Sequence, residues 1–233
     1  MRKHFGIFQN FWELLYPNLC VACRSYHPIP THVLCVHCRY HLSPSKMYLE
    51  QENLFTERFW GRIPLEAGAA MFNFTKGGRV QKLIHALKYE NRPDIGQRLG
   101  TWYGRQLLQH PTYASIELIV PVPLHPQKKH ERGYNQSDAF AKGLAESMQR
   151  PWIPNGLKRK TYSTSQTKKS RANRLASVME AFEIDTRAQL QGKHILLVDD
   201  VLTTGATLEA CAIKILKIPD TKISLLTIAL ARS

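Results

Sequence analysis

The sequence predicts an α/β protein in which a parallel sheet is flanked by helices and preceded by a small cysteine-rich module. The chain has 233 residues, of which 43% are apolar, enough for one substantial domain with a packed core and a small appendage. After residue 63, segments typical of buried strands alternate with segments of helical period, the order expected of a parallel sheet covered by helices. Two CxxC pairs lie before that part. We therefore expect two units, residues 1–62 and residues 63–233.

The first unit combines a short amphipathic helix, predicted from apolar residues at helical spacing between positions 8 and 15, with the two cysteine pairs. Cys20 and Cys23 form one pair, Cys35 and Cys38 the other, and eleven residues separate the pairs. Four thiolates form a structural zinc site that leaves no position open for water. Disulfides or four unconnected thiols are the alternatives, and a reducing cytosol disfavours disulfides. We expect a zinc ribbon, with Cys211 as a separate thiol in the core.

The second unit is expected to contain five strands and four main helices. Strands are predicted where apolar residues cluster, and helices where apolar residues recur every three or four positions. The predicted strands are residues 67–74, 116–123, 181–184, 193–200 and 222–230, and the predicted helices are residues 80–87, 93–109, 137–149 and 206–216. Prolines at positions 121 and 123 should end the second strand, because proline lacks a backbone donor. Residues 42–65 show no clear period and mark the boundary between the units.

The stretch ILLVDDVLTTGATL, residues 195–208, joins a buried strand to a helix. Open α/β sheets bind ligands at the carboxyl ends of their strands. The residues that open the helix are Thr203, Thr204, Gly205, Ala206 and Thr207. Hydroxyls and backbone N–H groups at a helix N-terminus suit a phosphate. Asp199 and Asp200 would repel a phosphate in direct contact and suit sugar hydroxyls or Mg²⁺ instead. The stretch therefore predicts a sugar-phosphate site.

The charge of the chain favours an anionic partner, because 32 Lys and Arg against 18 Asp and Glu leave a formal net charge of +14. Residues 125–174, here called the basic segment, hold 12 Lys and Arg against three acids. A merely basic surface is the alternative. Residues 158–169 have the lysines and hydroxyls of a mobile loop that could close over a ligand. The candidates for nucleic-acid contact are Lys128, Lys129, Lys158, Arg159, Lys160, Lys168, Lys169 and Arg171.

Residues 195–207 resemble the phosphoribosyl-pyrophosphate (PRPP) motif of type I phosphoribosyltransferases, in which four apolar residues and two acids precede T-T-G-A-T. The chain as a whole resembles the ComF family of bacterial competence proteins, in which a cysteine-rich zinc module precedes such a domain. The segments that carry this resemblance are the two CxxC pairs, LKYE (87–90), VPVPLHP (120–126), ERGYNQSD (131–138), Gln166, Arg174, AF (181–182) and the PRPP motif.

The resemblance implies a site for PRPP, or a related sugar phosphate, together with magnesium. Asp199 and Asp200 would contact the ribose hydroxyls, Asp199 would also serve the magnesium ion, and residues 203–207 would cradle the 5′-phosphate. The turn after Val120 would take the pyrophosphate. The pyrophosphate or loop candidates are Val122, Arg132, Gln166 and Arg174. Departures from the family pattern at His130, Lys169 and Ser177 leave the details of the loop open.

Three functions fit these observations. The chain could bind PRPP while taking part in single-stranded DNA handling during natural transformation, with a DNA-uptake helicase as a possible partner. It could instead be an active phosphoribosyltransferase, or a PRPP-sensing regulator without turnover. The resemblance and the basic segment favour the first. No apolar run reaches the ~18 residues of a membrane span, and no signal-like region opens the chain, so we expect a cytoplasmic protein without a transmembrane segment.

Overall fold

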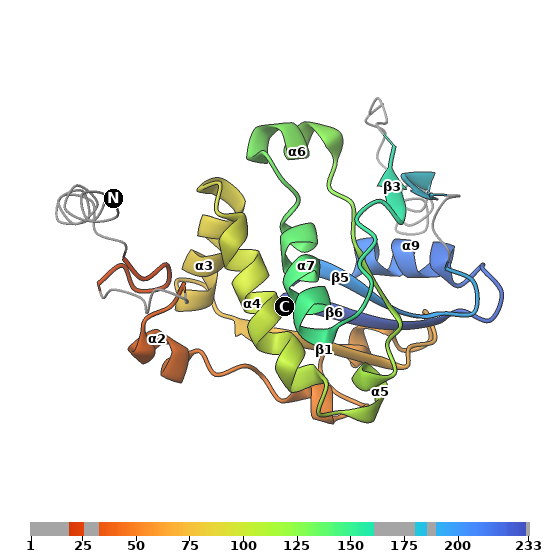
Figure 1. The fold of residues 1–233 in the computed structure, drawn as a ribbon, viewed down its shortest axis with the longest axis horizontal. Coiled ribbons are helices and arrows are strands. Elements are labelled where there is room, and N and C mark those ends of the chain that lie inside the picture. The colour runs from red at the N-terminus through yellow and green to blue at the C-terminus, as the bar shows by residue number, and fades with distance from the viewer. Residues whose placement is uncertain (1–18, 26–32, 161–179, 186–189, 232–233) are drawn as a thin grey trace, which may run out of the picture.

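The structure is a computed structural model that describes residues 19–25, 33–160, 180–185 and 190–231. Its centre is a parallel sheet of four strands, ordered β1-β6-β5-β2, which confirms the predicted fold class (Figure 1). These strands are β1 (Ala67–Phe74), β2 (Leu118–Pro121), β5 (His194–Leu202) and β6 (Lys222–Ala231). The strand predicted over 116–123 is shorter than expected, while the strand predicted over 193–200 extends to Leu202.

A separate two-stranded antiparallel sheet pairs β3 (Leu157–Arg159) with β4 (Phe182–Ile184). The sequence predicts the second of these strands but treats residues 158 and 159 as the start of a loop. The loop prediction is therefore wrong for these two residues. Three residues are too few for a period to be recognised, and it is the pairing with β4 that makes this short segment a strand.

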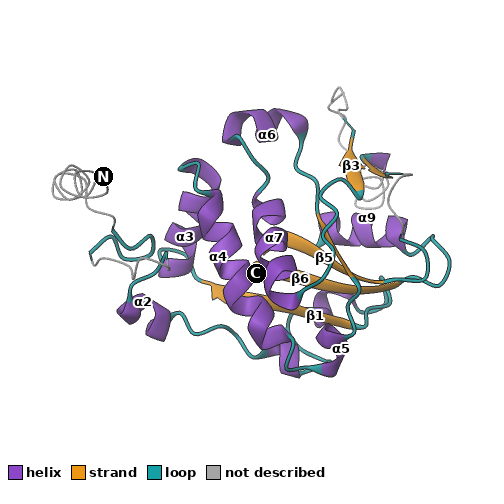
Figure 2. Cartoon of the chain, in the orientation of Figure 1, coloured by secondary structure: helices purple, strands orange, loops and turns teal. Residues whose placement is uncertain are grey.

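The helices predicted from long periodic segments are present, and short ones that the sequence did not reveal accompany them (Figure 2). The long helices are α3 (Arg79–Tyr89), α4 (Pro93–Leu107), α7 (Gln136–Met148) and α9 (Ala206–Ile215). The short ones are α2 (Val36–His41), α5 (Pro111–Ala114), α6 (Pro126–Arg132) and the 3-10 turns η1 (Met47–Leu49) and η2 (Thr56–Phe59). Helix α6 buries none of its residues, so no apolar period marks it.

The two faces of the sheet pack against different helices. Along β5, Leu196 and Val198 join a cluster with the apolar faces of α3, α4 and α7, whereas Ile195 and Leu197 join a second cluster with α9. Side chains that alternate along a strand point to opposite faces. Both faces of β5 are therefore buried, as expected of a strand inside a parallel sheet.

Helices α4 and α7 lie side by side across the first face and approach each other closely (Figure 1). A Cβ atom added at Gly143 of α7 would lie 1.9 Å from the backbone oxygen of Gln97 on α4. Glycine at this position allows the two backbones to touch. The close contact fixes the position of α7, whose first turn reaches the end of β5.

The N-terminal residues pack on the same sheet. Phe55 and Phe59, at 0% and 1% exposure, join the cluster that includes α9. Cys20 and Leu34 join the cluster on the opposite face, together with residues of α3 and α4. Residues on both sides of the expected boundary at position 62 thus share continuous apolar clusters.

Candidate functional site

Asp199 and Asp200 lie near the end of β5, where the carboxyl ends of β2 and β5 meet. Pro121 of β2 pairs with Val198, and the N–H of Val122 donates to the Val198 carbonyl at 2.8 Å. Asp199 pairs with Thr227 of β6. The two acids therefore occupy the edge of the sheet at which ligands bind in open α/β folds.

The turn from β5 to α9 is built around Gly205. This residue has φ of +81° and directly precedes Ala206, the first residue of α9. The side-chain oxygen of Thr204 accepts a hydrogen bond from the Ala206 N–H at 3.5 Å. Residues 201–208, together with Asp199, line a small hollow of about 40 Å³. Hydroxyls and a helix N-terminus around such a hollow can bind an anionic oxygen group.

The Gly205 turn rests on the N-terminal part of the chain. A Cβ atom added at Gly205 would lie 3.0 Å from Cε1 of Phe59. Arg62, three residues later, forms an ion pair with Glu209 in the first turn of α9, and Glu209 is buried. An aromatic ring and a partly buried ion pair thus hold the start of α9 in place. No sequence pattern predicted this support, because the two segments are far apart in the chain.

The environment of Asp199 favours its protonated form. Its Oδ1 atom accepts from the Ser137 hydroxyl at 2.8 Å and from the Asp200 N–H at 2.8 Å. Burial, followed by the neighbouring charge of Asp200, raises the pKa of Asp199 from 3.8 to about 7. Cations near the carboxylate, such as Mg²⁺, would oppose this effect.

Asp200 is directed toward a basic pocket. Its Oδ2 atom lies 2.8 Å from Nζ of Lys88, the lysine of the LKYE segment on α3. Lys88 also lines a neighbouring pocket of about 360 Å³. The residues that line this pocket are Lys88, Tyr89, Asn91, Lys128, Glu131 and Arg132. Sequence reasoning did not single out Lys88 as a site residue, and its place in the LKYE segment was the available signal.

Arg132 and Lys128 line this pocket, whereas Val122 does not and has its backbone groups bonded to other residues. Arg132 donates to the side-chain oxygen of Gln136 at 2.8 Å, and its guanidinium carbon lies 5.5 Å from the Tyr89 ring centre. Val122 is buried, its N–H is bonded as described above, and its carbonyl accepts from Asn135 at 2.9 Å. The polar groups of Val122 are therefore already bonded in this conformation.

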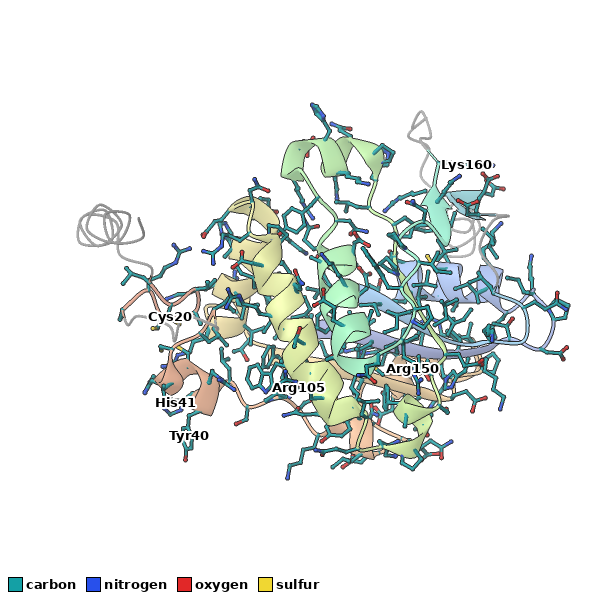
Figure 3. The ribbon with its side chains drawn as sticks, in the orientation of Figure 1. Cys20, Tyr40, His41, Arg105, Arg150 and Lys160 are labelled. Carbon is teal, nitrogen blue, oxygen red and sulfur yellow. The ribbon has the colours of Figure 1, made fainter. Side chains whose placement is uncertain are left out.

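The described basic candidates outside the pocket differ in their surroundings. Lys129 lies on α6, next to Lys128. Lys158 pairs with Asp185 at 3.3 Å, Lys160 pairs with Glu183, and the Arg159 guanidinium lies 5.2 Å from the Phe182 ring centre (Figure 3 labels Lys160). Five candidates lie outside the described residues: Gln166, Lys168, Lys169, Arg171 and Arg174.

The four cysteines predicted to bind zinc come together. The sulfur atoms of Cys20, Cys23, Cys35 and Cys38 all lie within 4.8 Å of one another, and none forms a disulfide (Figure 3 labels Cys20). The Cys23 and Cys35 sulfurs are 3.8 Å apart. Tetrahedral zinc with Zn–S bonds of about 2.3 Å places its sulfur ligands about 3.8 Å apart. The cluster therefore fits a structural zinc ion held by four sulfurs.

Burial raises the pKa of the Cys35 and Cys38 thiols, so these buried thiols depend on a cation to become thiolates. This dependence agrees with a metal centre rather than a reactive thiol. None of the helices in the described parts of the chain has the length and apolar character of a membrane span.

The fold and the two sites define an α/β protein with a four-stranded parallel sheet and an N-terminal four-cysteine cluster. The chain is 30% identical over 136 residues to the DNA utilization protein YhgH of Escherichia coli (strain K12), covering 57% of this chain and 59% of that protein. It is 34% identical over 93 residues to competence protein F of Haemophilus influenzae, covering 40% of this chain and 41% of that protein. These homologues confirm the resemblance to ComF competence proteins over the matched part of the chain.

A third relative, competence protein ComFC of Bacillus subtilis (strain 168), is 34% identical over 95 residues, or 41% of this chain and 36% of that protein. Among solved structures, glutamine PRPP amidotransferase from B. subtilis aligns with 62% of this chain and 30% of its own, at 20% identity and a TM-score of 0.43. The AQ2163 protein from Aquifex aeolicus aligns with 69% of this chain and 87% of its own, at 12% identity and a TM-score of 0.36. No protein-family model matches the chain.

Proposed function

We propose that this chain binds PRPP or a similar sugar phosphate at the end of β5 and takes part in handling single-stranded DNA during natural transformation. The observation that carries the ligand half is the Gly205 turn, which places a helix N-terminus and threonine hydroxyls beside two carboxylates. The DNA half is supported by the competence and DNA utilization proteins to which the chain is similar, and by its net charge of +14.

The ligand would occupy both parts of this site. Residues 203–207 would bind the 5′-phosphate through backbone N–H groups and hydroxyls at the start of α9. Asp199 and Asp200 would accept hydrogen bonds from the ribose hydroxyls, away from the phosphate that they would otherwise repel. Lys88, already bonded to Asp200, would balance the negative charge of this pair. The pocket beside Lys88 would take the pyrophosphate, with Lys128 and Arg132 as its cations.

Magnesium fits the same residues by the chemistry of its donors, because Mg²⁺ prefers carboxylate and phosphate oxygens. Asp199 is our candidate for this role, and the ion would neutralise the charge of the bound pyrophosphate. A reducing cytoplasm would keep the four cysteines available for zinc, so we place the activity there. A DNA-uptake helicase would be a natural partner for a protein that receives the incoming strand.

Calorimetry with PRPP and Mg²⁺ tests the ligand half. The double substitution Asp199→Asn with Asp200→Asn keeps the shape of the site and removes two charged acceptors, each worth roughly 1.5 to 3 kcal/mol. We expect the affinity to fall at least tenfold. A control with Glu66→Gln and Asp220→Asn removes two acids from other positions and should bind like the parent. Unchanged affinity in the folded double variant would remove the sugar-phosphate proposal.

Two further measurements separate the remaining functions. Release of pyrophosphate from PRPP in the presence of a panel of nucleobases would establish an active transferase, whereas binding without release would indicate a sensor or a structural ligand. Salt-dependent binding to a single-stranded oligonucleotide is expected for the DNA half, because neutralised phosphates release counterions. No binding at low ionic strength would remove direct DNA handling.

A further inference from the structure

Lys88 belongs to both parts of the candidate site. It is the next-to-last residue of α3, and its Nζ atom lies 2.8 Å from Oδ2 of Asp200. The same lysine lines the neighbouring pocket of about 360 Å³. The Lys88 and Asp200 side chains are 22% and 16% exposed, so the ion pair is largely shielded from solvent. One ammonium group thus lies between an acceptor proposed for the ribose and the pocket proposed for the pyrophosphate.

The pocket is formed by the end of α3 and by α6. Besides Lys88, its basic lining residues are Lys128 and Arg132, and Glu131 lines it as well. In this conformation the charge of Lys88 is balanced by Asp200. A diphosphate carries several negative charges, and Glu131 would oppose it. Release of Lys88 from Asp200 would therefore strengthen the binding of a diphosphate in this pocket.

Lysine has the chemistry to exchange one oxygen partner for another. Its ammonium group carries three donors at the end of a flexible stem, so it can turn without movement of the helix. The carboxylate of Asp200 would then be free to accept a hydrogen bond from a ribose hydroxyl. Asp199 is held differently, because its Oδ1 atom accepts from Ser137 and from the Asp200 N–H. An exchange by Lys88 would therefore change the bonding of Asp200 and leave these two bonds of Asp199 in place.

We propose that Lys88 couples the two parts of the site, because Asp200 holds it before a ligand binds and a diphosphate binds it afterwards, which frees Asp200 for a ribose hydroxyl. A ligand with both groups replaces the broken ion pair with two new contacts. A sugar phosphate without a diphosphate must compete with Lys88 for Asp200. Lys88 is thus a specificity-determining residue that favours sugar phosphates with a diphosphate group. This inference rests on the proposed function and assigns its choice of ligand to one side chain.

Binding of inorganic pyrophosphate alone tests whether Asp200 holds Lys88 back. Asp200→Asn keeps the shape of the side chain and releases the lysine, so it should bind pyrophosphate about three- to tenfold more tightly than the parent, as expected for a shielded ion pair. When Lys88→Met is added, this gain should shrink to less than about twofold, because no lysine remains to be released. Calorimetry without added Mg²⁺ measures these affinities, since the ion would itself bind the acids.

Glu131→Gln is the matched control for the removal of a negative charge. Glu131 also lines the pocket, but its side chain accepts from Gln127 at 3.1 Å. The effect of Glu131→Gln on pyrophosphate affinity should therefore be the same with and without Lys88→Met. The comparison of the two double-mutant cycles separates release of the lysine from removal of a charge.

The choice between two sugar phosphates tests the specificity. Lys88→Met should weaken PRPP binding at least about tenfold, as expected for the loss of one charge-assisted hydrogen bond, but should not weaken binding of ribose 5-phosphate. Lys82→Met is the control for the helix, because Lys82 is an exposed lysine of α3 that does not line the pocket. It should bind both ligands like the parent. A purely structural effect of Lys88→Met would weaken binding of both ligands alike.

The outcomes separate the inference from the proposed function. In a parent chain that binds PRPP, an equal gain from Asp200→Asn with and without Lys88→Met would overturn the inference alone. So would an equal loss of affinity for PRPP and ribose 5-phosphate in Lys88→Met, or no pyrophosphate binding in either the parent or Asp200→Asn. A parent chain that binds neither sugar phosphate would overturn the proposed function as well.

Discussion

Asp199 and Asp200 are neighbours in one strand, yet their side chains have different partners. Asp199 turns to the first turn of α7 and is bonded to Ser137, whereas Asp200 turns to α3 and is bonded to Lys88. Both acids are half-buried, and only Asp200 lies within ion-pair distance of the Lys88 ammonium group. The site thus contains one carboxyl group whose pKa is raised and a second one that is paired with a lysine.

The raised pKa of Asp199 makes ligand-free stability depend on pH. Between the ordinary pKa of 3.8 and the folded pKa of about 7, the folded chain holds a proton that the unfolded chain releases. The free energy of unfolding therefore falls as pH rises through this window. Asp199→Asn removes the effect and should stabilise the ligand-free protein more at pH 8 than at pH 5, by about 1 to 2 kcal/mol.

Urea denaturation of the parent and the variant at both pH values measures this difference. The expected difference is smaller than the full pKa shift would give, because Asp199 is half-buried and solvent screens its charge. An equal gain at pH 5 and pH 8 would mean that Asp199 is already ionised in the folded protein at pH 5.

At this scale the sequence predicted which residues would line the site but not which residues hold them in place. The acid pair, the threonines and Gly205 are contiguous, so the order of a strand, a turn and a helix could be read directly. Lys88 and Ser137 reach the acids from distant parts of the chain. Phe59 reaches Gly205 in the same way. Such contacts depend on how the elements pack, which a single sequence does not specify.

Among the elements, the turn into α9 combines a left-handed backbone conformation with a tight contact. Gly205 has φ of +81°, a conformation that costs other residues roughly 1 to 2 kcal/mol. It also lies against the ring of Phe59. A side chain at position 205 would meet both penalties, and any movement of the turn would disturb the proposed phosphate cradle.

A matched pair of substitutions separates the two penalties. Gly192 also has a positive φ, of +68°, but a Cβ atom there would meet nothing within 4 Å. Gly192→Ala should therefore lower the free energy of unfolding only by the backbone contribution. Gly205→Ala should lower it by at least about 1 kcal/mol more, typical of overpacking, and should also weaken PRPP binding. Thermal unfolding and calorimetry measure the two effects. Equal losses of stability in both variants, with PRPP affinity retained, would show that the Phe59 ring moves aside at little cost in free energy.

Element prediction from the sequence succeeded where the period was long. Residues 67–74 form β1 as predicted, and α3, α4, α7 and α9 lie within a few residues of their expected bounds. Helices α2 and α6 have six and seven residues and almost no buried positions. Local sequence does not mark such helices, because capping and contacts with neighbours determine them.

In the whole molecule, apolar packing is continuous across the expected boundary at position 62. Phe55 and Phe59 lie before the boundary but pack on the sheet and on Gly205 after it. Zinc and the sugar phosphate would thus bind at different places in a chain with continuous packing. The two proposed activities can influence each other through this packing.

Two shortened chains test this continuity. A chain of residues 43–233 loses the cysteine cluster but keeps Phe55 and Phe59, whereas a chain of residues 63–233 loses both rings. Removing a buried Phe side chain costs about 3 to 5 kcal/mol, and a whole domain is stable by only about 5 to 15 kcal/mol. We expect the chain of residues 43–233 to unfold cooperatively in urea. We expect the chain of residues 63–233 to show no cooperative unfolding transition. Equal unfolding midpoints would mean that the second unit folds independently of residues 43–62.

The position of β6 between β1 and β5 has a consequence for synthesis on the ribosome. Ala67 of β1 pairs with Ser224 of β6, so most of the chain must be translated before β1 finds its partner. At about 5 to 20 residues per second, this delay is roughly 10 to 30 s. Throughout that time β1 presents unpaired backbone groups, and one edge of β5 does so for the shorter interval before β6 is made. Such groups favour pairing with other chains. Correct folding therefore depends on keeping these two edges apart from neighbouring nascent chains until β6 emerges and closes the gap between them.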